Sequence, residues 1–269
     1  MSNFAYKVVS TCAVLSLSIV GSIGLSSPAR AYTVFFGEDL NNSSYRPLAE
    51  YDKATQAEAD FLSHLSGVGT ATFETFATQT YSPLSLDFGE AGTATLNGHG
   101  VIKSIPEGST NGYGRYAISQ NNYWEANAAG NNFLVEFSEA VAAFGFYGVD
   151  LGDFGGELTL NLNLANGTQT AVKVPNTVGR YGSTDGSVLY FGLIADSVEE
   201  VFTSLSFDMT APESGIMADI FAFDNMTVGS LSQVKHADGS QSQDVPEPAS
   251  VLALFAVGTL ATRIRKRIA

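Results

Sequence analysis

The chain has 269 residues, of which 45% are apolar and 15% charged, and its 27 acidic residues outnumber 13 basic ones to give a formal net charge of −14. The acidic balance argues against a nucleic-acid-binding protein, and the apolar fraction argues against a disordered chain. A single cysteine, Cys12, excludes an internal disulfide framework and a thiolate metal cluster.

Residues 1–31 have the pattern of a secretory signal peptide. Lys7 precedes a long apolar stretch, and Ala29 and Ala31 supply the small residues at −3 and −1 that a signal peptidase requires. Cleavage after Ala31 leaves Tyr32 as the mature N-terminus, so the sequence predicts export across the inner membrane. The alternative is a retained N-terminal membrane helix, because the stretch is almost long enough to span a bilayer.

Residues 32–228 are predicted to form one acidic, all-β domain. Residues 32–244 hold 26 of the 27 acidic residues but only 7 of the 13 basic ones. Residues 157–164 alternate strictly between apolar and polar, and Asn166-Gly167 then predicts a hairpin. Ten strand-length segments with glycine-rich turns favour a jelly-roll-like β-sandwich; they are 32–36, 84–88, 94–96, 132–137, 141–149, 157–164, 170–174, 188–194, 201–207 and 220–228.

One short helix is expected near the N-terminus of this domain. Residues 53–65 are rich in helix-forming residues, and Asp52 is a candidate N-cap. Phe61, Leu62 and Leu65 make one apolar face, which we expect to pack over one end of the sandwich.

A segment from Asn111 to Asn132 combines aromatic and polar residues. Aromatic faces pack against sugar rings, and amides and guanidinium groups bond to hydroxyls, so the segment predicts a sugar-contacting loop. The alternative is a long loop whose aromatic rings plug the end of the sandwich. The candidate ligand-binding residues are Tyr113, Arg115, Tyr116, Asn122, Tyr123 and Trp124.

Several acidic residues suggest a Ca²⁺ site, because Ca²⁺ prefers oxygen ligands in turns. Asp39, Asn41, Ser43 and Glu50 match positions 1, 3, 5 and 12 of an EF-hand-type loop, although position 6 is not glycine, and Asp224 is a fifth candidate ligand. The alternative is an Asx-rich turn. Two further acidic groups lie at expected strand ends, Asp150 with Asp153 and Asp219 with Asp224, where turn capping is the simpler interpretation of the first pair.

Motifs for known catalytic chemistry are missing from the sequence: there is no His-Glu-x-x-His, no Gly-x-Ser-x-Gly, no P-loop and no dinucleotide fingerprint. We therefore expect a protein that is not an enzyme. A carbohydrate-active enzyme with two convergent carboxylates stays the least favoured alternative.

The C-terminus has the order of a sorting signal. A polar stretch over 229–244 is typical of a flexible linker, Pro246-Glu247-Pro248 follows, and an apolar run over 249–261 ends in a basic cluster. The apolar run is shorter than the roughly 20 residues that span a bilayer untilted. This tail, residues 245–269, resembles a PEP-CTERM sorting domain with an apolar sorting helix, and an ordinary tail anchor is the alternative.

The resemblance implies processing by an exosortase-type transpeptidase and a place in the envelope, on the cell surface or in the extracellular matrix. Segments such as 143–150 and 223–229 also resemble other PEP-CTERM proteins, which implies an extracellular jelly roll. The expected function is a lectin-like module that binds extracellular polysaccharide, with Ca²⁺ as a cofactor. A structural biofilm or envelope protein without a specific ligand is the alternative.

Overall fold

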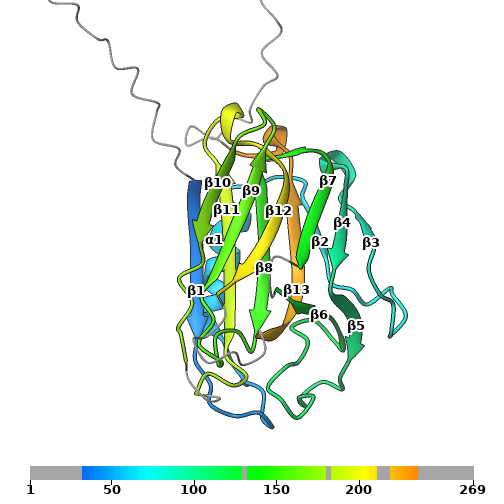
Figure 1. The fold of residues 1–269 in the computed structure, drawn as a ribbon, viewed down its shortest axis with the longest axis vertical. Helices are drawn as coiled ribbons and strands as arrows, with labels where there is room; N and C mark the ends of the chain where they lie inside the picture. The colour runs from blue at the N-terminus through cyan, green and yellow to red at the C-terminus, as the bar shows by residue number, and fades with distance from the viewer. Residues whose placement is uncertain (1–31, 129–131, 180–182, 211–218, 236–269) are drawn as a thin grey trace, which may run out of the picture. The chain divides into compact units, whose positions relative to one another are not determined.

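The structure is a computed structural model that describes residues 32–128, 132–179, 183–210 and 219–235 (Figure 1). The chain separates into two units, Met1–Arg30 and Ala31–Ala269, and every described residue belongs to the second. The predicted signal peptide and sorting segment lie outside the described residues. In the described part of the chain, no helix is long and apolar enough to cross a membrane.

The strands form two antiparallel sheets that face each other, as the sequence predicted for a jelly-roll-like β-sandwich (Figure 1). The first sheet has the order β1 (Tyr32–Asp39), β11 (Val188–Ala195), β8 (Ala143–Val149), β13 (Ile220–Gly229), β6 (Asn122–Asn127) and β5 (Gly100–Ser104), and β2 (Gly69–Ala71) also pairs with β13. The second has the order β10 (Gln169–Lys173), β9 (Leu158–Leu164), β12 (Phe202–Met209), β7 (Phe133–Val141), β4 (Thr93–Gly98) and β3 (Leu84–Asp87). Short 3-10 turns lie at Gly89–Ala91, Val198–Glu200 and Leu231–Gln233.

The main core fills the space between the sheets and is rich in phenylalanine. Phe207 of β12 stacks on Phe133 with ring centroids 4.4 Å apart, and Phe146 of β8 stacks on Phe223 at 5.1 Å. The strict alternation of β9 places its four leucines in this core and its threonine and asparagines on the outer face. The expected hairpin is present, with Asn166 Oδ1 accepting the Thr168 N–H and β9 pairing with β10.

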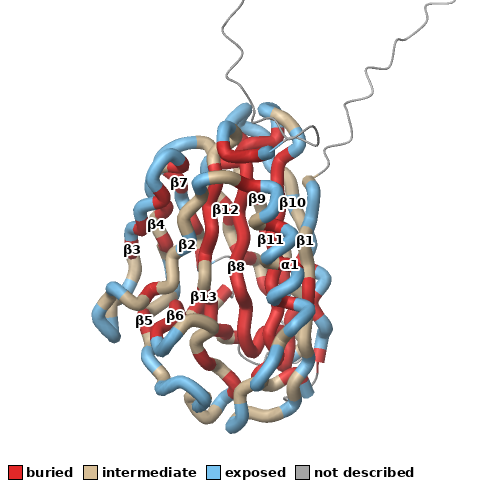
Figure 2. The backbone as a smooth tube through the Cα atoms, turned by 180° about the vertical axis from the view of Figure 1, so that it is seen from behind, coloured by how far each residue is buried: buried red, intermediate tan, exposed pale blue. Residues whose placement is uncertain are grey.

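A second apolar layer explains why β8 and β11 are buried on both faces. Every residue of the two strands is buried (Figure 2), because the outer face of the first sheet is covered by α1 (Asp52–Ser63) and by loops. A Cβ on Gly37 of β1 would lie 2.0 Å from the Lys53 carbonyl oxygen, so this glycine permits the close approach of the helix. The helix therefore packs on a sheet face, and the expectation that it covers one end of the sandwich is wrong.

The start of α1 also differs from the prediction. Asp52 is the first residue of the helix, and Tyr51 precedes it without a side-chain cap. The carboxylate of Asp39, at the end of β1, accepts the Ala54 N–H at 3.0 Å and so satisfies one of the free donors of the first turn. Asp39 therefore provides the helix cap that the sequence predicted for Asp52.

The ordered fold extends beyond the predicted boundary at residue 228. β13 includes Gly229, Val234 forms a β-bridge with Leu65, and the Gln233 side chain donates to the Gly67 carbonyl at 2.7 Å. Residues 229–235 are therefore part of the domain, in place of the flexible linker predicted for them. The rest of that linker, 236–244, lies outside the described residues.

Candidate functional site

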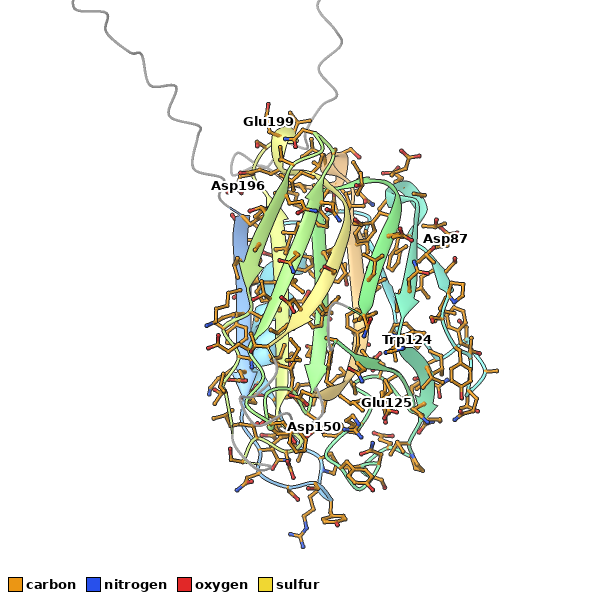
Figure 3. The ribbon with its side chains drawn as sticks, in the orientation of Figure 1. Asp87, Trp124, Glu125, Asp150, Asp196 and Glu199 are labelled. Atoms are coloured by element: carbon orange, nitrogen blue, oxygen red, sulfur yellow. The ribbon has the colours of Figure 1, made fainter. Side chains whose placement is uncertain are left out.

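Acidic side chains gather at one end of the first sheet, where three neighbouring strands meet. β8 lies between β11 and β13, and its last residue, Val149, pairs with Val188 near the start of β11 and with Ala222 near the start of β13. The loop after β8 and the loops before β11 and β13 therefore share this end (Figure 3). These loops supply the acidic cluster, which we define as Asp150, Asp153, Asp185 and Asp219.

Carboxylate oxygens of Asp150, Asp153 and Asp185 all lie within 4.8 Å of one another. Asp219 interacts with Asp153, and its Oδ2 accepts the Gly152 N–H from the same loop as Asp153. Asp150, Asp153 and Asp219 are at most 3% exposed, and Asp185 is half-buried. Three carboxyl groups are thus clustered, Asp219 adjoins them through Asp153, and the region is largely buried.

Basic charge reaches this cluster through Arg115. Its Nη1 donates to Asp150 Oδ2 at 3.3 Å and to the Ile220 carbonyl at 3.0 Å, while its Nε donates to Glu125 Oε2 at 3.1 Å. Asp150 also accepts the Gly186 N–H at 2.9 Å. One guanidinium is therefore divided between Glu125 and the cluster, which leaves an excess of carboxyl groups.

The pKa values reflect this crowding. Burial raises the pKa of Asp150 to about 7, against the lowering effect of the Gly186 N–H, and burial raises the pKa of Asp153 to about 6. The pKa of Asp219 also lies well above its ordinary value, because the residue is buried and, to a smaller extent, because Asp153 is close to it. Without a counter-charge, the cluster favours protonated carboxyl groups.

The structure does not bring the predicted Ca²⁺ ligands together as one ligand set. Asp39 caps α1, Asn41 donates to the Arg46 carbonyl at 2.8 Å, and Ser43 Oγ accepts the Arg46 N–H at 3.1 Å. These contacts correspond to the Asx-turn alternative. Glu50 is exposed, and the fully buried Asp224 accepts three backbone N–H groups.

The part of the predicted sugar-contacting loop that holds Asn122, Tyr123 and Trp124 is a buried strand. Residues 122–127 form β6 between β13 and β5, so that Trp124 points into the main core and Tyr123 into the layer under the loops, both fully buried. Tyr116 and Asn122 are also buried, the first donating to the Gly186 carbonyl and the second to the carbonyls of residues 73 and 76. The exception among the predicted aromatic residues is Tyr113, which is 70% exposed. The prediction of a binding surface built on Trp124 is therefore wrong.

A separate groove runs along the free edge of the first sheet, between β1 and α1. Its volume is about 840 Å³, and it is lined by both apolar and polar side chains. Val34 is 44% exposed there, and the side chains of Asp52, Lys53, Gln56 and Asp60 are exposed along the helix. No local sequence pattern indicates this groove, because it exists only where the helix docks beside an edge strand.

Comparison with protein families gives a match at the C-terminus. Residues 244–267 match the model of the PEP-CTERM protein-sorting motif. The chain therefore carries a PEP-CTERM sorting domain. The motif marks an exported, envelope-associated protein and implies recognition by exosortase-type processing machinery, as the tail predicted. No curated protein matches the chain.

Solved structures of low sequence identity resemble part of this chain. A DUF4465 family protein from Bacteroides caccae is 11% identical, with a TM-score of 0.37, over 61% of this chain and 100% of its own. The CBM22-1 xylan-binding domain of Paenibacillus barcinonensis Xyn10C is 13% identical, with a TM-score of 0.33, over 63% and 96%. TmCBM61, solved with β-1,4-galactotriose, is 14% identical, with a TM-score of 0.28, over 60% and 94%.

Proposed function

We propose that this exported, envelope-associated protein is a non-catalytic, lectin-like module that binds extracellular polysaccharide. The observation that carries the proposal is the open groove between β1 and α1. Polysaccharides present hydroxyl groups along their edges and apolar C–H faces on their rings, so a fitting site combines polar side chains with apolar surface.

The groove meets both requirements. Gln56 and Asp60 are joined by a hydrogen bond of 2.8 Å and present amide and carboxylate groups to solvent, while Val34 of β1 is an exposed apolar residue that lines the same groove. β1 is the edge strand of its sheet and pairs with β11 alone among the described strands, so the backbone groups on its outer edge are not paired with another described strand. An open groove admits an extended chain more readily than it encloses a small molecule.

Binding is tested with the purified full-length chain, first on a glycan array and then by titration calorimetry with any polysaccharide that binds. Val34→Glu places a charge in the groove and is expected to weaken binding at least tenfold. Val198→Glu is the matched control, because Val198 is exposed on the Val198–Glu200 turn and does not line the groove. Thermal unfolding of each variant confirms that the fold is retained.

A blank array would overturn the proposal and favour a structural envelope protein without a specific ligand. Equal loss of binding in both variants would remove the groove as the site. Turnover of a bound polysaccharide would contradict the non-catalytic part of the proposal.

A further inference from the structure

The acidic cluster contains oxygen atoms that the fold buries without a partner. Asp153 Oδ1 and Asp219 Oδ1 are inaccessible to solvent and have no hydrogen-bond partner among the described residues. Their residues are 3% and 2% exposed. A buried acceptor that lacks a donor is costly, and a buried carboxylate without a counter-charge is more so. Both oxygens belong to the carboxylates that the strand ends bring together, and a bound cation would satisfy them.

We propose that Asp150, Asp153, Asp185 and Asp219 bind one Ca²⁺ ion at this end of the sandwich. This inference is independent of the polysaccharide groove and uses other residues than the Asp39–Glu50 turn and Asp224.

The donor set decides the class of metal. The group contains carboxylates and neither histidine nor cysteine, so it favours a hard, oxygen-seeking cation over zinc or copper. Ca²⁺ accepts six to eight oxygens in irregular geometry, whereas Mg²⁺ requires a near-ideal octahedron and retains several waters. Carboxylates from three separate loops in a largely dry volume fit the first preference better.

The charge balance agrees with this assignment. Arg115 is shared between Asp150 and Glu125, and the structure shows no basic side chain bound to Asp153 or Asp219 among the described residues. A divalent cation would neutralise the remaining carboxylates. In the absence of the cation, protons take this role, because the pKa values of the carboxyl groups are raised.

The ion would connect segments that are distant in sequence. Asp150 and Asp153 follow β8, Asp185 precedes β11 and Asp219 precedes β13. Asp185 also accepts the hydroxyl of Ser44, whose carbonyl accepts the Gly114 N–H at 2.9 Å. Calcium is therefore expected to hold this whole end of the domain together and to raise its resistance to unfolding.

The experiment compares thermal unfolding of the purified full-length chain in calcium, in magnesium and in chelator, together with calorimetric titration by Ca²⁺. Saturating calcium, at about 100 times Kd, is expected to raise Tm by roughly 5–10 °C. The titration should give one ion per chain. A magnesium effect equal to that of calcium would overturn the choice of metal, and an unchanged Tm with no binding heat would overturn the site.

Asp153→Asn and Asp219→Asn separate metal binding from a purely structural role. Each substitution keeps the side-chain shape and removes a buried, uncompensated charge, so in chelator we expect each variant to be at least as stable as the parent. In calcium the order should reverse, because each variant loses at least tenfold in affinity. Asp87→Asn, on the exposed end of β3, is the matched control and should respond to calcium like the parent. A calcium-induced rise in Tm that is the same in all four proteins would refute the assignment.

Discussion

Trp124 is a core residue and not the binding residue that the sequence predicted, and its substitution tests this placement directly. It is the only tryptophan of the chain, and its side chain is fully buried between the two sheets (Figure 3). Gly100 of the neighbouring strand leaves the space that the indole fills, since a Cβ there would lie 2.1 Å from the ring. Substitution by alanine should therefore act on stability.

The magnitude follows from the buried area. A tryptophan side chain buries roughly 200 Å², which at about 25 cal/mol per Å² corresponds to about 5 kcal/mol of hydrophobic free energy. Large-to-small core substitutions of this kind cost about 3–5 kcal/mol, a large part of the ~5–15 kcal/mol that stabilises a typical domain. Trp124→Phe should cost at least about 2 kcal/mol less, because it retains an aromatic ring and removes an indole N–H that has no partner among the described residues.

The assay is urea unfolding followed by far-ultraviolet circular dichroism, since the variants lack the fluorophore. In the parent, tryptophan emission should shift to longer wavelength on unfolding and should resist quenching by acrylamide before it. A native emission typical of a water-exposed indole, or an unfolding midpoint unchanged in Trp124→Ala, would refute the buried placement. Any polysaccharide bound by the parent should bind the folded fraction of Trp124→Phe equally well.

Three further predictions follow from other buried groups. Burial raises the pKa of Asp224 to about 8, from 3.8, despite the backbone N–H groups that it accepts. Between these two pKa values the folded state holds one more proton than the unfolded state, so the free energy of unfolding should fall by up to about 1.4 kcal/mol per pH unit as pH rises. Asp224→Asn should remove this part of the slope. Denaturant titrations in chelator from pH 5 to 8 measure it, and parallel plots of unfolding free energy against pH for the parent and the variant would refute the prediction. Gly37→Ala should cost about 1–3 kcal/mol in urea unfolding by pushing α1 off the sheet, whereas Gly69→Ala, whose Cβ would meet Phe88 Cδ1 at an ordinary contact distance of 4.0 Å, should cost less than about 1 kcal/mol. Arg115→Met should lose about 3 kcal/mol at pH 8, because it leaves the buried Asp150 without its ion-pair partner and leaves Glu125 with Lys103 alone, at 3.9 Å; a thermal unfolding curve that matches the parent would contradict the buried ion pair.

Local patterns in the sequence determined the fold class and the route of the protein. Alternation over 157–164 requires a strand with one wet face, and Asn166-Gly167 requires a tight turn, so both features appear where they were predicted. The Pro246-Glu247-Pro248 tail was recognisable because sorting machinery reads a short linear motif. These signals depend on neighbours in the chain, and folding does not alter them.

Contacts between distant segments were decided only by the tertiary structure. Trp124 looked like a loop residue because its strand is short, and only the pairing of β6 with β13 and β5 buries it. Asp39 looked like a metal ligand, but the docking of α1 makes it a helix cap. The sequence places Asp150, Asp153 and Asp219 at strand ends but gives no such signal for Asp185, and the convergence of the four requires the strand order β11-β8-β13. Strand order depends on long-range packing of apolar faces, which no local sequence window encodes. For this reason the sequence determined the sandwich and its export, while the tertiary structure alone placed the acidic cluster and the groove.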